Sequence, residues 1–136
     1  MSTEFRGEGN IGSAPEYREF PTDEEEPDRL LRLSVYFDNP VPTDDGFVDK
    51  GGFWMPVEIR HPDAHHWSKL YQKGMRVLVI GRQVREEWTD DAGNPSVAIK
   101  IRARPVSILP YRLERVVLTP KTDASTNPGE RDEPET

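Results

Sequence analysis

Apolar and polar residues alternate with a period of two along much of this chain, and this alternation constrains its fold more than any other feature. Four apolar residues within 31–38, from Leu31 to Phe37, alternate with mostly polar neighbours, which predicts a half-buried β-strand. Residues 53–60 and 99–104 show the same pattern. Residues 75–84 are apolar on both faces through the run 77–80, which predicts a strand covered from both sides.

Three weaker signals refine this set of strands. Residues 5–11 and 17–20 alternate less regularly and predict a first strand pair. Pro56 has no backbone N–H, so we expect it at an edge or a bulge of its strand. Gly81 lies inside an apolar run, which predicts a bend or bulge of the kind that a closing barrel needs.

One segment, residues 62–73, has a helical period instead. Its apolar residues are spaced as on one face of a helix, with Pro62 at the start and Lys73-Gly74 at the end. The predicted order is strand, strand, strand, helix, strand, strand. We therefore predict an all-β domain, a five-stranded barrel of the oligonucleotide/oligosaccharide-binding (OB) type with one helix between strands 3 and 4.

Three polar segments interrupt or follow this order. Residues 21–28 form an acidic loop, and residues 39–52 form a loop punctuated by proline and glycine. The stretch 119–136 contains almost nothing to bury, so we expect a disordered acidic tail. The predicted domains are an OB-fold domain over residues 1–118 and this tail over residues 119–136.

The distribution of charge separates the middle of the chain from its flanks. Residues 1–59 carry 5 Lys/Arg and 14 Asp/Glu, a net charge of −9, and residues 119–136 carry −3. Residues 60–118 carry 11 Lys/Arg and 6 Asp/Glu, a net charge of +5, within a chain of net charge −7. Because binding depends on the local field near a groove, an acidic total does not exclude a nucleic-acid partner.

The strand alternation also predicts which residues point away from the barrel. They are cations and aromatics together: Arg32, Tyr36, Trp54, Arg60, Lys100, Arg102 and Arg104. Single-stranded nucleic acid needs this mixture, because phosphates attract cations and unpaired bases stack on aromatic rings. Ordinary solvent-facing strand residues would explain the cations alone, but a large exposed aromatic such as Trp54 indicates a partner, either DNA or another subunit.

A second cluster of the same kind lies in residues 82–94, which read as a strand running into a long hairpin with its turn at Asp91-Ala92-Gly93. Arg82, Arg85 and Trp88 combine cations with an aromatic on an arm that could reach along a DNA strand. A flexible hairpin whose tryptophan packs on its own base is the alternative.

Several classes of function are not supported by the residues present. The chain has no cysteine and no secretory signal or apolar run of membrane-spanning length, which suits the reducing cytoplasm. We find no nucleophile–base pair, phosphate-binding loop or dinucleotide turn, so we expect no enzyme and no cofactor. His61, His65 and His66 suggest a metal, but without an HExxH pattern we interpret them as solvated histidines.

Three stretches taken in order resemble the bacterial single-stranded DNA-binding protein family. Residues 9–18 look like its first-strand signature, residues 70–82 like its helix end, Lys-Gly turn and following strand, and residues 85–90 followed by Gly93 like its tryptophan-bearing hairpin. The resemblance covers roughly residues 9–109. The chain is similar in particular to the divergent relatives carried on conjugative plasmids and integrative elements.

The resemblance implies an OB-fold protein that is not an enzyme, usually a homotetramer, and that coats single-stranded DNA without sequence preference. Its stacking tryptophans match Trp54 and Trp88. Arg60 stands where the family has a third aromatic, and the acidic end at Glu135-Thr136 lacks the family's closing phenylalanine. Fewer stacking platforms and weaker recruitment of replication or recombination proteins are therefore expected.

Two other functions remain open at this point. The first is an OB-fold protein-interaction module of a replication or mobilisation complex with little DNA affinity, which Arg60 and the net charge of −7 favour. The second is a histidine metalloenzyme, which stoichiometric zinc would have to support. We expect a homo-oligomer, a tetramer before a dimer, as the binding form.

Overall fold

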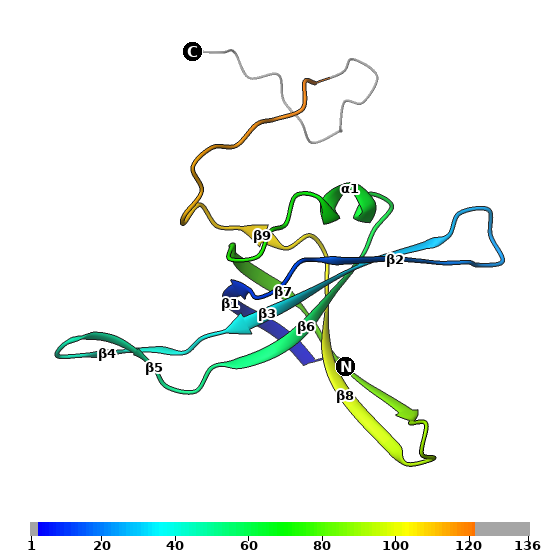
Figure 1. Cartoon of the computed structure of the whole chain (residues 1–136), viewed down its shortest axis with the longest axis horizontal. Helices are drawn as coiled ribbons and strands as arrows, with labels where there is room; N and C mark the ends of the chain where they lie inside the picture. Colours follow the sequence, from blue (N-terminus) through cyan, green and yellow to red (C-terminus); the bar gives the residue numbers. More distant parts are fainter. Residues whose placement is uncertain (1–2, 122–136) are drawn as a thin grey trace.

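The computed structural model describes residues 3–121 and shows one β-barrel with two hairpin arms (Figure 1). The barrel strands are β1 (Thr3–Ile11), β3 (Asp28–Phe37), β6 (Phe53–Arg60), β7 (Arg76–Thr89) and β8 (Pro95–Ala103). The other elements are β2 (Glu16–Phe20), β4 (Pro40–Thr43), β5 (Gly46–Asp49), α1 (Ala64–Ser68) and β9 (Ser107–Ile108). Within residues 3–121, the structure contains no helix with the length and hydropathy of a membrane span.

Strand pairing closes the sheet into a ring. The strands follow one another in the order β1, β3, β6, β8, β7, and β7 pairs back to β1 over eight residue pairs from Thr3–Gln83 to Asn10–Arg76. Only the contact between β6 and β8 is parallel within this ring. The helix α1 lies between the third and fourth barrel strands of the described residues, so the predicted OB-type barrel is confirmed.

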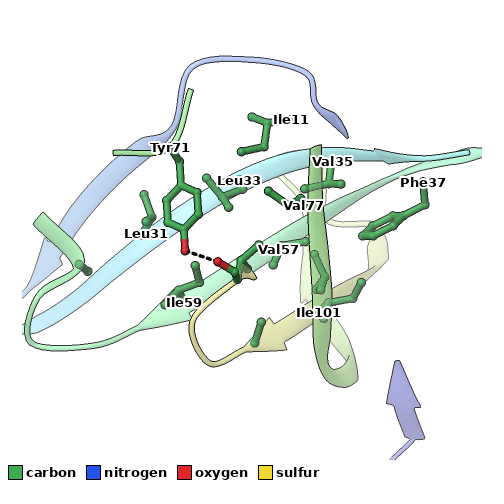
Figure 2. Packing of buried hydrophobic residues seen from close by; sticks show 14 residues of the cluster. Ile11, Leu31, Leu33, Val35, Phe37, Val57, Ile59, Tyr71, Val77 and Ile101 are labelled. Atoms are coloured by element: carbon green, nitrogen blue, oxygen red, sulfur yellow. Dashed lines mark hydrogen bonds between the residues drawn. The ribbon is translucent and has the colours of Figure 1, made fainter. Parts of the chain in front are cut away.

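The interior of the ring is filled by the residues that the alternation assigned to it. Leu31, Leu33 and Val35 of β3 are fully buried, and Val57 and Ile59 of β6 pack against them (Figure 2). Phe53 at the start of β6 is exposed, contrary to the alternation, because β6 pairs there with β3 alone and its ladder to β8 begins only at Val57. Burying such side chains stabilises the fold by about 1.5–3 kcal/mol each.

The predicted first strand pair is wrong in its partners. β1 and β2 do not pair with each other; both pair with β3, β2 along its first half and β1 at Asn10 and Ile11. They are successive pieces of one edge, separated by a bend at residues 12–15. Local alternation identified both strands, but which strand is the neighbour depends on contacts distant in sequence.

The helix is shorter than the predicted range of 62–73. It ends at Ser68, after which Leu70 is exposed and the chain turns through Gly74. Tyr71 nevertheless enters the core, where its hydroxyl donates to the carbonyl oxygen of Val106 at 2.7 Å (Figure 2). Burial of this aromatic ring explains the helical spacing that the sequence suggested.

Two further expectations about strands are corrected. β7 is not covered on both sides within this chain, because the side chain of Ile80 on its outer face is 45% exposed. The segment 39–52 is not an irregular loop: β4 and β5 pair there as an isolated hairpin arm. Prolines and glycines at the ends of these short strands hid the pairing in the sequence.

Pro56 and Gly81 occupy positions that need their special chemistry. Pro56 pairs with β3 at Ser34, and the parallel ladder to β8 begins only at Val57. Pro56 therefore has a paired strand on one side only, which is the edge position that was predicted. The register at Gly81 is uninterrupted towards both β1 and β8, so there is no bulge. A Cβ atom at Gly81 would lie 2.3 Å from the carbonyl oxygen of Arg102, and glycine is needed for this close approach.

The predicted tail lies almost entirely outside the described residues. Of the stretch 119–136, the structure describes only Thr119, Pro120 and Lys121, which belong to no helix or strand. The division into two domains stays a prediction.

The hydrogen bond of Tyr71 generates a test of the core. We expect Tyr71→Phe to lower the free energy of unfolding by about 1–2 kcal/mol, because the Val106 carbonyl would lose its buried donor. Urea denaturation followed by circular dichroism measures this change. Tyr17→Phe is the matched control, because its hydroxyl bonds to Glu19 on the surface. Equal losses in both variants would contradict the role assigned to the buried bond.

Candidate nucleic-acid interface

A belt of charged residues runs around the outer face of the barrel. The strand registers place them side by side in the order Glu16, Arg32, Glu58, Arg102, Arg82 and Glu4. Each belongs to a different strand, and neighbours along the belt have opposite charges except for Arg102 and Arg82, which are both positive. Its three arginines, Arg32, Arg82 and Arg102, were predicted as site residues from the sequence, and its three glutamates were not.

An aromatic pair lies on the same outer face beside the belt. Tyr36 of β3 and Trp54 of β6 are cross-strand partners, with ring centroids 5.2 Å apart. The Trp54 side chain is 59% exposed. Its indole lies over Gly12, where any Cβ atom would come within 2.1 Å of the ring. Glycine at position 12 therefore leaves the space that this indole occupies, while its other parts stay open to a ligand.

The β4–β5 arm holds Tyr36 in place through Asp49. Its hydroxyl donates a hydrogen bond to the carboxylate of Asp49, which also accepts the backbone N–H of Asn39. The hydrogen bond to Asp49 raises the pKa of Tyr36, and the same bond lowers the pKa of Asp49. Asp49 is therefore ionised and Tyr36 neutral at pH 7, so that the contact persists and fixes the ring next to Trp54.

Four of the predicted cations are exposed and make no ion pair within the part of the chain that the structure describes. They are Arg32, Arg82, Arg102 and Arg104. Guanidinium groups with free donors bind phosphate oxygens in a bidentate manner. This arrangement is suited to an extended polyanion that crosses the barrel.

Two other predicted cations are exposed but already paired with carboxylates. Arg60 contacts Asp28 at 2.6 Å, and Arg85 pairs with Glu87 on its own strand. Arg85 also points to the opposite face of β7 from Arg82 and Trp88, since it differs from them by an odd number of residues along the strand. The structure thus separates Arg85 from the cluster in which the sequence analysis had placed it.

Lys100 differs most from expectation. It lies on the outer face of β8, but its side chain is only 8% exposed, so it is not the free surface cation that was predicted. Its ammonium group lies 2.9 Å from Glu58 and 2.7 Å from Glu86. Neighbouring strands contribute both carboxylates, which the alternation within one strand cannot reveal.

Trp88 lies near the end of the β7–β8 arm, opposite Ser96, and its side chain is 48% exposed. The arm ends in the predicted turn, where the Asp90 carboxylate accepts the backbone N–H groups of Ala92 and Asn94. Figure 1 shows this arm extending away from the end of the barrel that carries α1. Trp54 and Trp88 are therefore two separate exposed indoles rather than one cluster.

Three residues near this surface were missed by the sequence analysis. Asp49 was hidden in a segment interpreted as a loop, and Glu86 in an acidic pair with Glu87. Phe20 of β2 is 42% exposed and lines, together with Arg32, a hollow of the outer face. The alternation of β2 puts Phe20 on the same face as an arginine, and this combination could have identified it from the sequence.

The histidines take separate places away from the belt. His61 stacks on Trp67 with ring centroids 4.1 Å apart, and the ring of His65 lies against Tyr17. Within residues 3–121, no three histidine or acidic side chains come together in a way that could hold a metal ion.

Comparison with solved structures places the fold among single-stranded DNA-binding proteins. The small single-stranded DNA-binding protein of Streptomyces coelicolor matches with a TM-score of 0.65 and 16% identity over 79% of this chain and 94% of that chain. The SSB of Plasmodium falciparum in its complex with ssDNA matches with a TM-score of 0.62 and 16% identity, over 80% and 96% of the two chains. No curated protein matches the sequence.

A deletion mutant of the single-stranded DNA binding protein from Thermus aquaticus also matches, with a TM-score of 0.62 and 19% identity over 82% of this chain and 52% of that chain. At these identities the structures establish the fold. The sequence itself matches the model of the single-strand binding protein family over residues 8–109. With an OB-type barrel, and with a family match across most of that barrel, this chain belongs to the single-strand binding protein family.

Proposed function

We propose that this protein binds single-stranded DNA on the outer face of its barrel, without sequence preference and without catalysis. The observation that carries the proposal is the exposed Trp54, lying beside the half-buried Tyr36 and next to unpaired arginines of the charged belt. Bases stack on the aromatic rings while the arginines bind the phosphates. Such binding protects exposed strands during replication, recombination or conjugative transfer, where replication or recombination proteins would be its partners.

Membership of the family supports this proposal over a protein-interaction module. The related structure from Plasmodium falciparum was solved with ssDNA, and nearly the whole length of that protein aligns with this chain. An exposed indole alone would suit a protein partner equally well, but the unpaired guanidinium groups on the same face favour DNA, because they bind phosphates.

A fluorescence titration tests the function directly. Oligo-dT added to the protein at low salt should quench tryptophan fluorescence, and duplex DNA of equal length should bind more weakly, because its bases are not available for stacking. The affinity should fall steeply with salt, since each phosphate contact releases a condensed counterion. Absence of any titration with oligo-dT at low salt would favour the protein-interaction module instead.

The stacking residues generate a further prediction. Trp54→Ala and Trp88→Ala should each weaken binding of oligo-dT by about 1–3 kcal/mol, the usual contribution of one stacked base. Fluorescence anisotropy of a labelled oligonucleotide measures both. Trp67→Phe is the control, because Trp67 packs against His61 beside the helix, away from the belt. Unchanged affinity in the Trp54/Trp88 double variant would show that stacking does not carry the binding.

We also propose that the binding form is a homo-oligomer, a tetramer before a dimer. Among residues 3–121, no strand pairs with the second edge of β1 from Thr3 to Gly9, and Ile80 is exposed on the outer face of the adjacent strand β7. An open strand edge next to an apolar side chain is suited to pairing with a second copy of the same chain.

The assembly is tested by light scattering after size-exclusion chromatography. The parent protein should have a multiple of the 15.6 kDa chain mass, and Ile80→Lys should shift it towards the monomer, because a charge would be buried in the contact. Phe47→Lys, at an exposed apolar site on the β4–β5 arm, should leave the mass unchanged. A parent protein that is monomeric at all concentrations would refute the assembly.

A further inference from the structure

A hollow of about 240 Å³ on the outer face collects charged side chains from five strands. Its lining includes four cations and two carboxylates: Arg18, Arg32, Arg60, Lys100, Glu58 and Glu86. Arg18 and Arg60 face carboxylates outside the hollow, Glu16 and Asp28. The remaining cations, Arg32 and Lys100, are the groups that determine which anion the hollow holds.

Lys100 is held between a buried carboxylate and an exposed one. Glu58 lies below it at 2.9 Å with a side chain only 6% exposed, whereas Glu86 contacts it at 2.7 Å with a side chain 53% exposed. The pair of Lys100 and Glu58 is already neutral. Glu86 is therefore a second anion on one ammonium group, and it is the one that solvent can reach.

The surroundings of Glu86 are those of an anion site. Lys100 lowers the pKa of Glu86 through a hydrogen bond, and Arg102 and Arg32 lower it further through their charges. Three cations from two other strands thus converge on one carboxylate that β7 contributes. A phosphodiester group has the same single negative charge and the same kind of acceptor oxygens.

We propose that the Glu86 carboxylate occupies a phosphate subsite of the DNA-binding surface, and that a backbone phosphate of single-stranded DNA replaces it on Lys100. This inference rests on the proposed function and adds a competing residue to it. Glu86 acts as an intramolecular competitor that sets the affinity of the site. Lys100 then binds DNA as the sequence analysis expected, but only after this exchange.

The exchange keeps the local charge balanced. One monoanion leaves Lys100 and another takes its place, while Glu58 stays buried beside the ammonium group. The displaced Glu86 side chain moves into solvent without exposing apolar surface, because half of it is exposed already. Arg32 and Arg102 have no ion pair among the described residues, so both are available to the incoming phosphate.

The test compares Glu86→Gln with Glu87→Gln in titrations of oligo-dT at several salt concentrations. Both changes remove one negative charge from the same strand, but Glu87 points to the opposite face and pairs with Arg85. Glu86→Gln should bind about three- to tenfold more tightly than the parent at low salt, and Glu87→Gln within about twofold of it. The salt dependence of Glu86→Gln should be steeper, by up to about 0.7 in the slope of log K against log salt.

Each outcome decides the inference. If the parent binds oligo-dT and Glu86→Gln binds no more tightly than Glu87→Gln, the competition is overturned and the proposed function stands. If no variant binds, both are overturned, whereas binding by Glu86→Gln alone would show that the competitor blocks the site fully. Thermal unfolding checks that the variants are folded. Should Glu86→Gln not fold, Glu86→Asp, which draws the carboxylate back by one methylene, must show the tighter binding.

Discussion

Hydrogen bonding between β1 and β7 closes the sheet, and the rest of the structure depends on this closure. Once the ring is closed, every barrel strand has one face inside and one outside, so alternate residues are divided between core and surface. Arg76 strengthens the junction, since its guanidinium binds Glu8 of β1 and Asp38 at the end of β3. The aromatic pair and the charged belt are therefore positioned by rigid strands rather than by loops.

The alternation of apolar and polar residues was enough to predict most of the barrel strands. It identified the inward residues of β3 and the position of the helix, because both follow from local periodicity and burial. It did not reveal that β1 and β2 share β3 as a neighbour, since pairing joins residues distant in sequence. The β4–β5 arm was missed because an isolated hairpin has no core face and thus no alternation to detect.

The same reasoning explains what was predicted of the candidate site. The outward direction of Arg32, Trp54 and Arg102 follows from their parity along each strand. Parity would also have separated Arg85 from Arg82 and Trp88, had it been applied to the arm. The burial of Lys100 was beyond any single-strand pattern, because Glu58 and Glu86 reach it from two other strands.

The mixture of three positive and three negative groups in the charged belt has a consequence for the kinetics of capture. Neighbouring positive and negative groups cancel at distances greater than their spacing, so the field of the belt decays quickly into solvent. A polyanion is then not guided towards this face from afar, as it would be by a uniformly basic surface. We therefore expect association at rates nearer those of uncharged partners, with individual guanidinium groups acting only once the strand has arrived.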